Sequence, residues 1–317
     1  MIIALDFGNG FSVASTGKHT VSLPSAFAQS NILTPLTDST VTYSLPGQTP
    51  VMVGEAVRFD SDATSTLNQT KPKTAPKIFP ALLALLNNQK PISGQELSLR
   101  VVDTNPKTNQ QAYSEALKGE WDVFYKKGLE QYRLKVQVTE VDCYREGLGT
   151  YNKLLEAAIT PNELKPYKAV INVGAGTADA VIFNARGAEV EAKSLDDLGS
   201  IYFSTKLTEA LRNSGKLTTD ISTNDMFKAL ETGELIIWDR RAAKESKLNL
   251  KSTLTTQSLK YYQTVIQKLI GVMDNRTLVG EFILTGGLAY WVKLPSKTNI
   301  KIAINPLTDN AEGIINV

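Results

Sequence analysis

The segment Ile3-Ala-Leu-Asp-Phe-Gly-Asn-Gly10 begins as an apolar strand and runs directly into a glycine-rich turn. Two later segments repeat this design: Val170-Ile-Asn-Val-Gly-Ala-Gly-Thr-Ala-Asp179 and Phe282-Ile-Leu-Thr-Gly-Gly287. Backbone amides approach phosphate oxygens closely only where side chains are small, and glycine also tolerates the backbone dihedrals that such turns need. The three segments therefore predict three ligand-binding loops, each following a strand.

Length and charge narrow the class of protein. A chain of 317 residues is about twice a typical domain, which is compatible with two lobes and a cleft. The 34 basic and 32 acidic residues give a net charge of +2, which is too balanced to favour direct, non-specific DNA binding. Any role with nucleic acid is therefore expected to run through an adaptor.

The chain has one cysteine, Cys143, and one histidine, His19. These are too few for an intramolecular disulfide, a cysteine-based zinc site or a Cys-His dyad, and Cys143 is expected to be an inert, partly buried thiol. The first residues lack the basic region of a signal peptide, and no run of about 18 apolar residues exists to span a membrane. We expect a soluble, cytoplasmic protein.

The first half of the chain reads as strands around one buried helix. A hairpin is expected over residues 1–15, and an inserted small subdomain over about 28–75, ending in a solvated linker at 70–76. Residues 78–88 are apolar nearly all round, which predicts a buried helix. Further strands are expected at 20–23, 41–44, 51–53, 97–102, 119–125 and 132–141, with a helix after Gly149.

The second half repeats the opening hairpin, because strands at 168–173 and 180–184 flank a second glycine turn. The repetition predicts an α/β chain of two related lobes. Lobe I is expected to comprise residues 1–146 and 300–317, and lobe II residues 147–299. Elements expected in the rest of the chain are helices at 200–213, 224–232, 253–274 and 309–315 and strands at 281–284 and 300–304.

The first loop offers the amides of Gly8, Asn9 and Gly10 beside the carboxylate of Asp6. Amides can cradle phosphates, and a carboxylate beside them can hold magnesium through water. The alternative is an ordinary hairpin with an Asn-Gly turn. The first loop alone does not decide between the two.

The second loop supplies Gly174, Ala175, Gly176 and Thr177, with Asp179 two residues further on. The alternative is a glycine-rich turn in a buried sheet. Phosphate binding is favoured over it, because the same design occurs twice in the chain. Neither loop is a Walker A sequence, so the common P-loop NTPase class is excluded. No Gly-x-Gly-x-x-Gly occurs, so the dinucleotide-binding fingerprint is absent.

The third loop contains Gly286, Gly287 and Leu288, where flat backbone is suited either to a nucleoside or to tight packing of a helix on a strand. Glu146 follows an apolar strand and precedes Gly147. Its carboxylate could orient a nucleophilic water in line with a γ-phosphate, or it could be a first-turn glutamate favoured by the helix dipole.

Together these segments resemble the bacterial actin-like, plasmid-partition ATPases of the ParM/StbA type over nearly the whole chain. The similar segments are Asp6–Gly10 and Asn172–Asp179 (the two phosphate motifs), Thr285–Gly287 (the adenosine motif), Val53–Ala56, Leu198–Ser200 with Gly199 on the nucleoside side, and Asn310–Gly313. Glu146 falls where this family keeps its water-positioning Glu or Gln. One departure is Asn172, because the second motif usually opens with Asp.

The resemblance implies an actin-like fold that binds ATP or GTP with Mg²⁺ and polymerises into filaments. Asp6, Asn172 and Asp179 would hold the metal, and Glu146, Asp6 and Asn172 would act in hydrolysis. The neutral side chain of Asn172 removes one negative charge, so weaker magnesium binding or slower hydrolysis is expected. Such proteins move or segregate plasmid DNA through a DNA-binding adaptor at a centromere.

Three other readings remain open. A small-molecule kinase of the same superfamily would need a substrate motif, which the sequence does not show. A chaperone-like ATPase would need a substrate-binding domain after the nucleotide domain. A structural filament with slow hydrolysis is compatible with Asn172.

Overall fold

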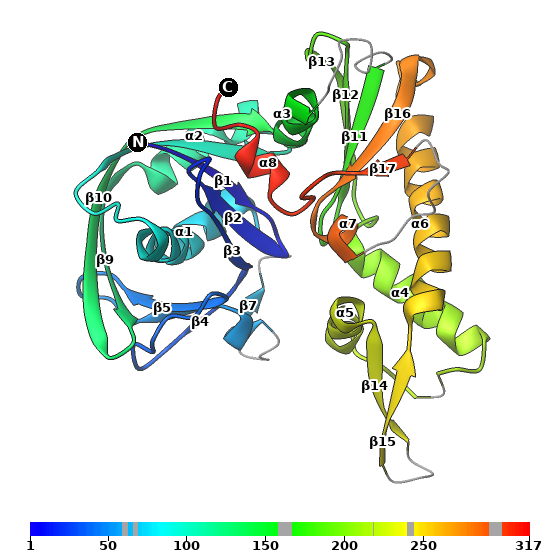
Figure 1. Cartoon of the computed structure of the whole chain (residues 1–317), viewed down its shortest axis with the longest axis horizontal. Coiled ribbons are helices and arrows are strands. Elements are labelled where there is room, and N and C mark those ends of the chain that lie inside the picture. The colour runs from blue at the N-terminus through cyan, green and yellow to red at the C-terminus, as the bar shows by residue number, and fades with distance from the viewer. Residues whose placement is uncertain (59–62, 66–68, 158–166, 218, 240–243, 292–299) are drawn as a thin grey trace. The chain divides into compact units, whose positions relative to one another are not determined.

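The computed structural model of the chain describes residues 1–58, 63–65, 69–157, 167–217, 219–239, 244–291 and 300–317 (Figure 1). The chain divides into two compact units, Met1–Ala157 with Leu307–Val317, and Ala158–Pro306. We refer to them as unit 1 and unit 2. Each unit contains a sheet with helices and its own hydrophobic core, so the chain is an α/β protein.

The described strands of unit 1 form a ten-stranded sheet in the order β3-β2-β1-β8-β10-β9-β5-β6-β4-β7. At its centre β1 (Ile2–Phe7) runs parallel to β8 (Glu96–Asp103), which runs parallel to β10 (Glu130–Arg145). The other strands are β2 (Phe11–Ser15), β3 (Thr20–Pro24), β4 (Ala26–Gln29), β5 (Thr40–Ser44), β6 (Val51–Gly54), β7 (Thr64–Ser65) and β9 (Gly119–Lys127).

Alternation along β1 assigns its residues to two cores. Ile3, Leu5 and Phe7 belong to the large core of unit 1, whereas Ala4 belongs to a smaller core on the opposite face. Successive side chains of a strand point to opposite faces, so Asp6 shares the face of Ala4. This alternation directs the carboxylate away from the large core.

The solvated linker expected at residues 70–76 is wrong, because helix α1 (Lys71–Gln89) already begins there. Pro72 lies in the first turn, where a missing N–H costs nothing. Pro76 and Pro80 each remove a hydrogen bond from the helix interior, but the turns from Ile78 to Leu86 are buried, and this burial offsets the loss. Figure 1 shows strands of the sheet passing around α1, which contacts β2, β3, β5 and β9.

The other described α-helices of unit 1 are α2 (Pro106–Leu117), α3 (Leu148–Ala157) and α8 (Asp309–Glu312), and a 3-10 helix spans Glu55–Val57. The sequence analysis missed α2, whose polar sequence buries only Tyr113 and Leu117. Helices α3 and α8 pack together, and this contact keeps α3 in unit 1 rather than in the second lobe.

Unit 2 contains a five-stranded sheet in the order β13-β12-β11-β16-β17. Strands β11 (Tyr167–Val173) and β12 (Ala178–Phe183) form the expected hairpin, and β16 (Val279–Thr285) runs parallel to β11. The remaining elements are β13 (Glu189–Leu195), β14 (Glu234–Asp239), β15 (Lys244–Asn249), α4 (Ser200–Asn213), α5 (Thr223–Thr232), α6 (Lys251–Gly271) and α7 (Gly287–Trp291).

The last strand, β17 (Ile300–Ile302), pairs with β16 and therefore belongs to unit 2. The sequence analysis had assigned it to the first lobe, but its partly buried isoleucines pack against the core of unit 2. Strands β13, β14 and β15 were also missed, since the sequences of β13 and β15 are rich in charged residues and lack a clear apolar alternation.

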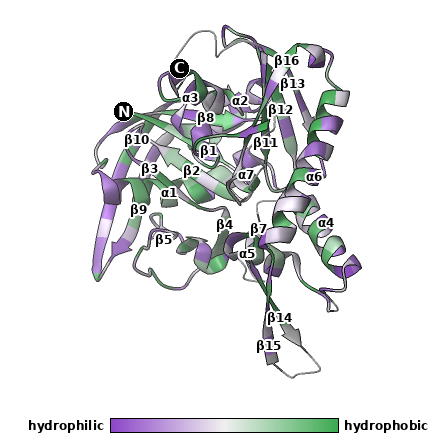
Figure 2. Ribbon diagram, turned by 45° about the vertical axis from the view of Figure 1, so that its right-hand side comes forward, coloured by the Kyte–Doolittle hydropathy of each residue, from purple (hydrophilic) through white to green (hydrophobic). Residues whose placement is uncertain are grey.

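Figure 2 shows both hydrophilic and hydrophobic stretches on α6, which is consistent with an amphipathic helix that buries one face. Its buried face includes Tyr262, Val265 and Leu269. No helix in the described ranges is both long enough and apolar enough to cross a bilayer.

Candidate functional site

Three acidic residues lie where the parallel strands of unit 1 end. Asp6 is near the end of β1, Asp103 ends β8, and Glu146 follows β10. Parallel strands present their carboxyl ends at one edge of a sheet, which is where ligands bind in open α/β sheets. All three residues are at least 92% buried, at 8%, 1% and 5% exposure respectively. The fold therefore concentrates negative charge at this edge.

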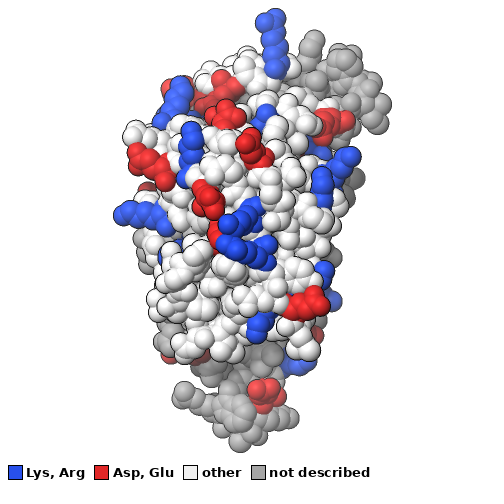
Figure 3. Space-filling view, turned by 90° about the vertical axis from the view of Figure 1, so that its left-hand side faces the viewer, with Lys and Arg blue, Asp and Glu red and all other residues white. Residues whose placement is uncertain are grey.

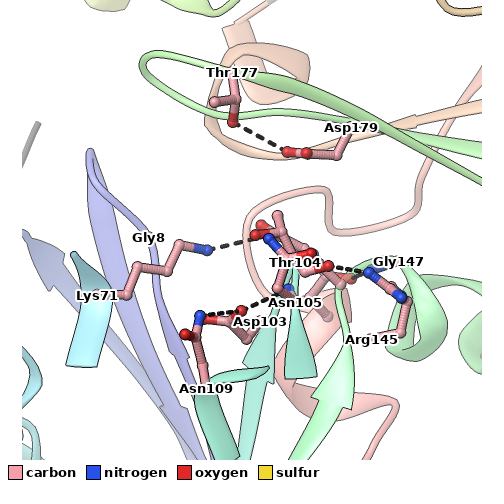
Figure 4. Close-up of polar contacts among 12 residues, drawn as sticks. Gly8, Lys71, Asp103, Thr104, Asn105, Asn109, Arg145, Gly147, Thr177 and Asp179 are labelled. Carbon is pink, nitrogen blue, oxygen red and sulfur yellow. Dashed lines mark hydrogen bonds and ion pairs between the residues drawn. The ribbon is translucent and has the colours of Figure 1, made fainter. Parts of the chain in front are cut away.

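A single lysine contact compensates part of this charge. The Nζ atom of Lys71 lies 3.1 Å from Oε2 of Glu146, and both side chains are largely buried (Figure 4). The backbone N–H of Glu146 donates to the carbonyl of Asp103 at 3.0 Å. The sequence analysis did not find Lys71, because it treated the start of α1 as a solvated linker.

Burial is the main reason that the pKa of Asp6 is raised from 3.8 to about 7. The negative charges of Glu146 and Asp103 raise it further, whereas Lys71 and a side-chain hydrogen bond from Asn310 lower it. Within the described residues, the buried Oδ1 atom of Asp6 has no hydrogen-bond partner. A buried carboxylate oxygen of this kind fits a hydrated cation, so the chemistry of unit 1 is compatible with the predicted role of Asp6.

Asp103 has a different environment. Its Oδ1 accepts hydrogen bonds from the backbone of Asn105 at 2.6 Å and from Nδ2 of Asn109 at 2.9 Å (Figure 4). Its Oδ2 accepts the hydroxyl of Tyr113 at 3.0 Å. Because both oxygens already have donors, Asp103 is suited to holding the start of α2 rather than to binding a ligand.

Ser25 fixes the carbonyls of the first loop. Its hydroxyl donates to the carbonyl of Gly8, and its backbone N–H donates to the carbonyl of Gly10 at 3.0 Å. Gly8 is required here, because a Cβ atom would lie 2.4 Å from the carbonyl oxygen of Phe11. Asn9 lies between these two glycines. Sequence reasoning missed Ser25, whose contribution depends on the pairing of β2 with β3.

The carbonyls of the second loop are fixed in the same way, by the N-terminus of α4. The N–H groups of Gly199, Ser200 and Ile201 donate to the carbonyls of Gly176, Gly174 and Ala175, at 3.0, 2.9 and 3.1 Å respectively. A Cβ atom on Gly199 would lie 2.3 Å from the carbonyl oxygen of Ala175. Gly199, which the sequence analysis assigned to the nucleoside side, therefore packs closely against the second loop.

Three polar residues form a row across neighbouring strands of unit 2. Asn172 on β11 pairs in register with Asp179 on β12 and with Thr285 on β16. All three are buried, with exposures of 5%, 6% and 0%. Thr177 donates its hydroxyl to Oδ2 of Asp179 at 3.1 Å (Figure 4). The row gathers Asn172, Asp179 and the end of the second loop at one place.

The third loop packs directly against this row. Gly286 has a φ of 91°, and a Cβ atom on it would lie 2.4 Å from Oδ1 of Asn172. Its N–H and the hydroxyl of Thr285 both donate to the carbonyl of Pro306, at 2.8 and 3.0 Å. Leu288 is 2% exposed and belongs to the core, whereas Gly287 is partly exposed.

The predicted metal residues are divided between the units, with Asp6 in unit 1 and Asn172 and Asp179 in unit 2. Within the described ranges, no group of three or more His, Cys, Asp or Glu side chains could hold a metal ion. A magnesium ion typically takes one or two carboxylates and completes its shell with water and phosphate oxygens. Asp6 in unit 1, and Asn172 with Asp179 in unit 2, each match the small number of protein donors that such an ion takes.

Cys143 is partly buried, and burial is the main cause that raises the pKa of its thiol to about 12. The thiolate is the reactive form, so this environment favours the inert thiol that the sequence analysis predicts.

The chain has the actin-like fold, as the sequence predicts. Among solved structures it is similar to a ParM protein in a 15-stranded filament from Clostridium botulinum, with 17% identity, a TM-score of 0.72, and 98% of this chain and 97% of that chain covered. The archaeal actin homologue Ta0583 gives 18% identity and a TM-score of 0.74, with 99% and 98% covered. A Bacillus thuringiensis ParM solved with ATP has 14% sequence identity and a TM-score of 0.66, with 99% of this chain and 96% of that chain covered.

No protein-family model matches the sequence, and no curated protein matches it significantly. At these identities the structural similarity establishes the fold.

We predict that Asp6→Asn becomes relatively more stabilising as pH rises. The pKa of Asp6 in the folded chain lies above the ordinary 3.8, so the folded state holds the proton more tightly than the unfolded state. The stability from this group is fully present below about pH 4 and is lost as pH rises to about 7. The free energy of unfolding of the variant, minus that of the wild type, should therefore increase between pH 5 and pH 8. Asp38→Asn, at an exposed position, is the control and should show no such trend.

We predict that Lys71→Met lowers the free energy of unfolding at pH 8 by about 3 kcal/mol, because it leaves the carboxylate of Glu146 buried without its partner. Adding Glu146→Gln to this variant should recover most of the loss. Lys206→Met, which breaks the exposed pair with Glu209, should cost less than about 1 kcal/mol. Equal losses for the two lysine variants in denaturant titrations would contradict the role assigned to burial.

Proposed function

We propose that this protein is a nucleotide-dependent, filament-forming ATPase of the actin-like class. The observation that carries the proposal is the shared design of its first two loops. In each, a strand ends in small residues whose carbonyls accept hydrogen bonds from a neighbouring segment, Ser25 in unit 1 and the start of α4 in unit 2. Carbonyls held in this way do not compete for the positions where amides would meet phosphate oxygens.

In this proposal the amides of residues 8–10 and 174–177 contact the phosphates of ATP or GTP, and residues 286–288 contact the nucleoside. Asp6, Asn172 and Asp179 are the residues that would hold Mg²⁺, which when bound neutralises charge on the phosphates. The unpartnered Oδ1 of Asp6 supports this assignment.

Glu146 would orient the water that attacks the γ-phosphate. Its side chain is buried, and the ammonium group of Lys71 lies 3.1 Å from its Oε2 atom, where it would help to hold the carboxylate in place. Lys71 is therefore a partner of Glu146 in the proposed site.

The proposal also includes filament formation and plasmid segregation. Both are supported by the fold that the chain shares with a ParM filament protein. We propose that the cargo is reached in the cytoplasm through a DNA-binding adaptor. The charge balance agrees with an indirect role, because on the face seen in Figure 3 basic and acidic side chains are interspersed. Ion pairs among the described residues include that of Arg133 with Asp122.

The proposal is tested by sedimentation and negative-stain microscopy of the purified protein with ATP, GTP, ADP or no nucleotide, each with magnesium. We expect filaments with a triphosphate that disassemble as phosphate is released. Tight nucleotide binding without assembly under any condition would instead favour a small-molecule kinase and would overturn the filament proposal.

Within the same assay, we predict that Glu146→Gln leaves the Kd of the nucleotide within about threefold, slows phosphate release by at least about 100-fold and lengthens filament lifetime. The amide has the size of the carboxylate but is a poor acceptor for a proton of water. Unchanged phosphate release in this variant would remove Glu146 from the mechanism.

We predict that Asn172→Asp tightens magnesium binding in the presence of nucleotide by about threefold to tenfold. The change is nearly isosteric, which matters because Gly286 packs closely against Oδ1 of Asn172, and it adds one negative charge. Titration of phosphate release against Mg²⁺ measures the effect. An unchanged magnesium requirement would show that Asn172 is not near the metal.

A further inference from the structure

A buried asparagine near the C-terminus contacts the turn that carries Glu146. Asn310 lies in α8 and is 2% exposed. Its Oδ1 atom accepts the backbone N–H of Gly147 at 3.0 Å and the hydroxyl of Thr150 at 3.1 Å. The residue that immediately follows Glu146 in the chain is therefore held by a side chain that is more than 160 residues away in the sequence.

The backbone around Asn310 leaves it little freedom to move. A Cβ atom on Gly149 would lie 2.0 Å from the carbonyl oxygen of Asn310, and one on Gly313 would lie 1.9 Å from the carbonyl oxygen of Gly149. Such backbone contact between α3 and α8 is possible only with glycine at both places. Arg100 also donates to the carbonyls of Ile314 and Ile315, at 2.8 and 2.7 Å, which anchors the chain after α8.

The same side chain reaches the second acidic residue of this site. The Asn310 side chain lies close enough to Asp6 to lower the pKa of its carboxyl group. An asparagine carries an acceptor and a donor on one rigid amide, so it can accept from Gly147 and Thr150 while it donates to a carboxylate. Neither Asp nor Leu, which have a similar shape, can do both.

We propose that Asn310 is a positioning residue that fixes the turn carrying Glu146 relative to Asp6. In this position the Glu146 carboxylate can orient the water that attacks the γ-phosphate. This role rests on the function proposed above. The two peptide groups that flank Glu146 are held from different sides. Its own N–H donates to Asp103, and the N–H of Gly147 donates to Asn310. Without Asn310, the N–H of Gly147 loses this acceptor, and the backbone at Glu146 is held from one side only.

The test compares Asn310→Ala with Asn152→Ala. Nδ2 of Asn152 donates to the carbonyl of Gly313 at 2.9 Å, so this control removes another contact between α3 and α8 without touching the turn of Glu146. Phosphate release, nucleotide Kd, melting temperature and hydrogen exchange of the Gly147 amide are measured for each full-length protein, alone and combined with Glu146→Gln.

We expect Asn310→Ala to slow phosphate release at least tenfold, to leave the Kd within about threefold and to speed exchange at Gly147. Asn152→Ala should lower the melting temperature but keep normal phosphate release. In the Glu146→Gln background, Asn310→Ala should cost nothing further, because residues that act as a unit are non-additive. If the alanine variant does not fold, Asn310→Ser, which is too short to reach both Gly147 and Asp6, should give the same pattern.

Normal phosphate release in the Asn310 variant, or equal losses with and without Glu146, would overturn the positioning role and leave the proposed function intact. Unchanged exchange at Gly147 would also overturn it. A wild-type protein that binds nucleotide but hydrolyses neither ATP nor GTP would overturn the proposed hydrolysis, and the positioning role with it.

Discussion

The parallel pairing of β1 with β8, and of β8 with β10, is the constraint on which the rest of unit 1 depends. It places Asp6, Asp103 and Glu146 at one edge of the sheet, although about 140 residues of sequence separate the first from the last. Gathering carboxylates in a buried position is unfavourable unless each finds a compensating partner. Asp103 finds amide and hydroxyl donors, Glu146 finds Lys71, and Asp6 keeps an unsatisfied oxygen and a raised pKa.

In the two candidate phosphate loops, similar turns are held by structurally unrelated segments. In unit 1 a single serine between β3 and β4 holds the carbonyls of Gly8 and Gly10. In unit 2 the same kind of contact comes from backbone amides at the start of α4, which need Gly199 for their close approach. The opening hairpins of the two units are alike, whereas the segments that support their turns are not. The support is therefore a property of each unit's own topology.

The resemblance of the chain's motifs to a known family predicted the actin-like fold. Local patterns predicted both opening hairpins, because glycine turns after apolar strands are local signals. They did not predict that α1 begins at Lys71, since Pro72 and Pro76 indicate a break, and only burial of the later turns shows that the helix forms. Ser25 and Asn310 were missed or left without a role because their contacts depend on strand pairing or on the return of the chain at α8. Lys71 was missed because the start of its helix was taken for a linker. Contacts between residues that are far apart in the chain produce no periodic pattern in the sequence.

Thr285 and Gly286 both donate to the carbonyl of Pro306, the last residue of unit 2 before the chain re-enters unit 1. Upstream, Ile302 is fixed by pairing with Leu284 in the same unit. The segment from Ile302 to Pro306 is therefore held at both ends within unit 2, by β16 and by the third loop. An insertion or deletion of one residue in this segment would displace the third loop, so homologues are expected to keep its length even where the residue types change.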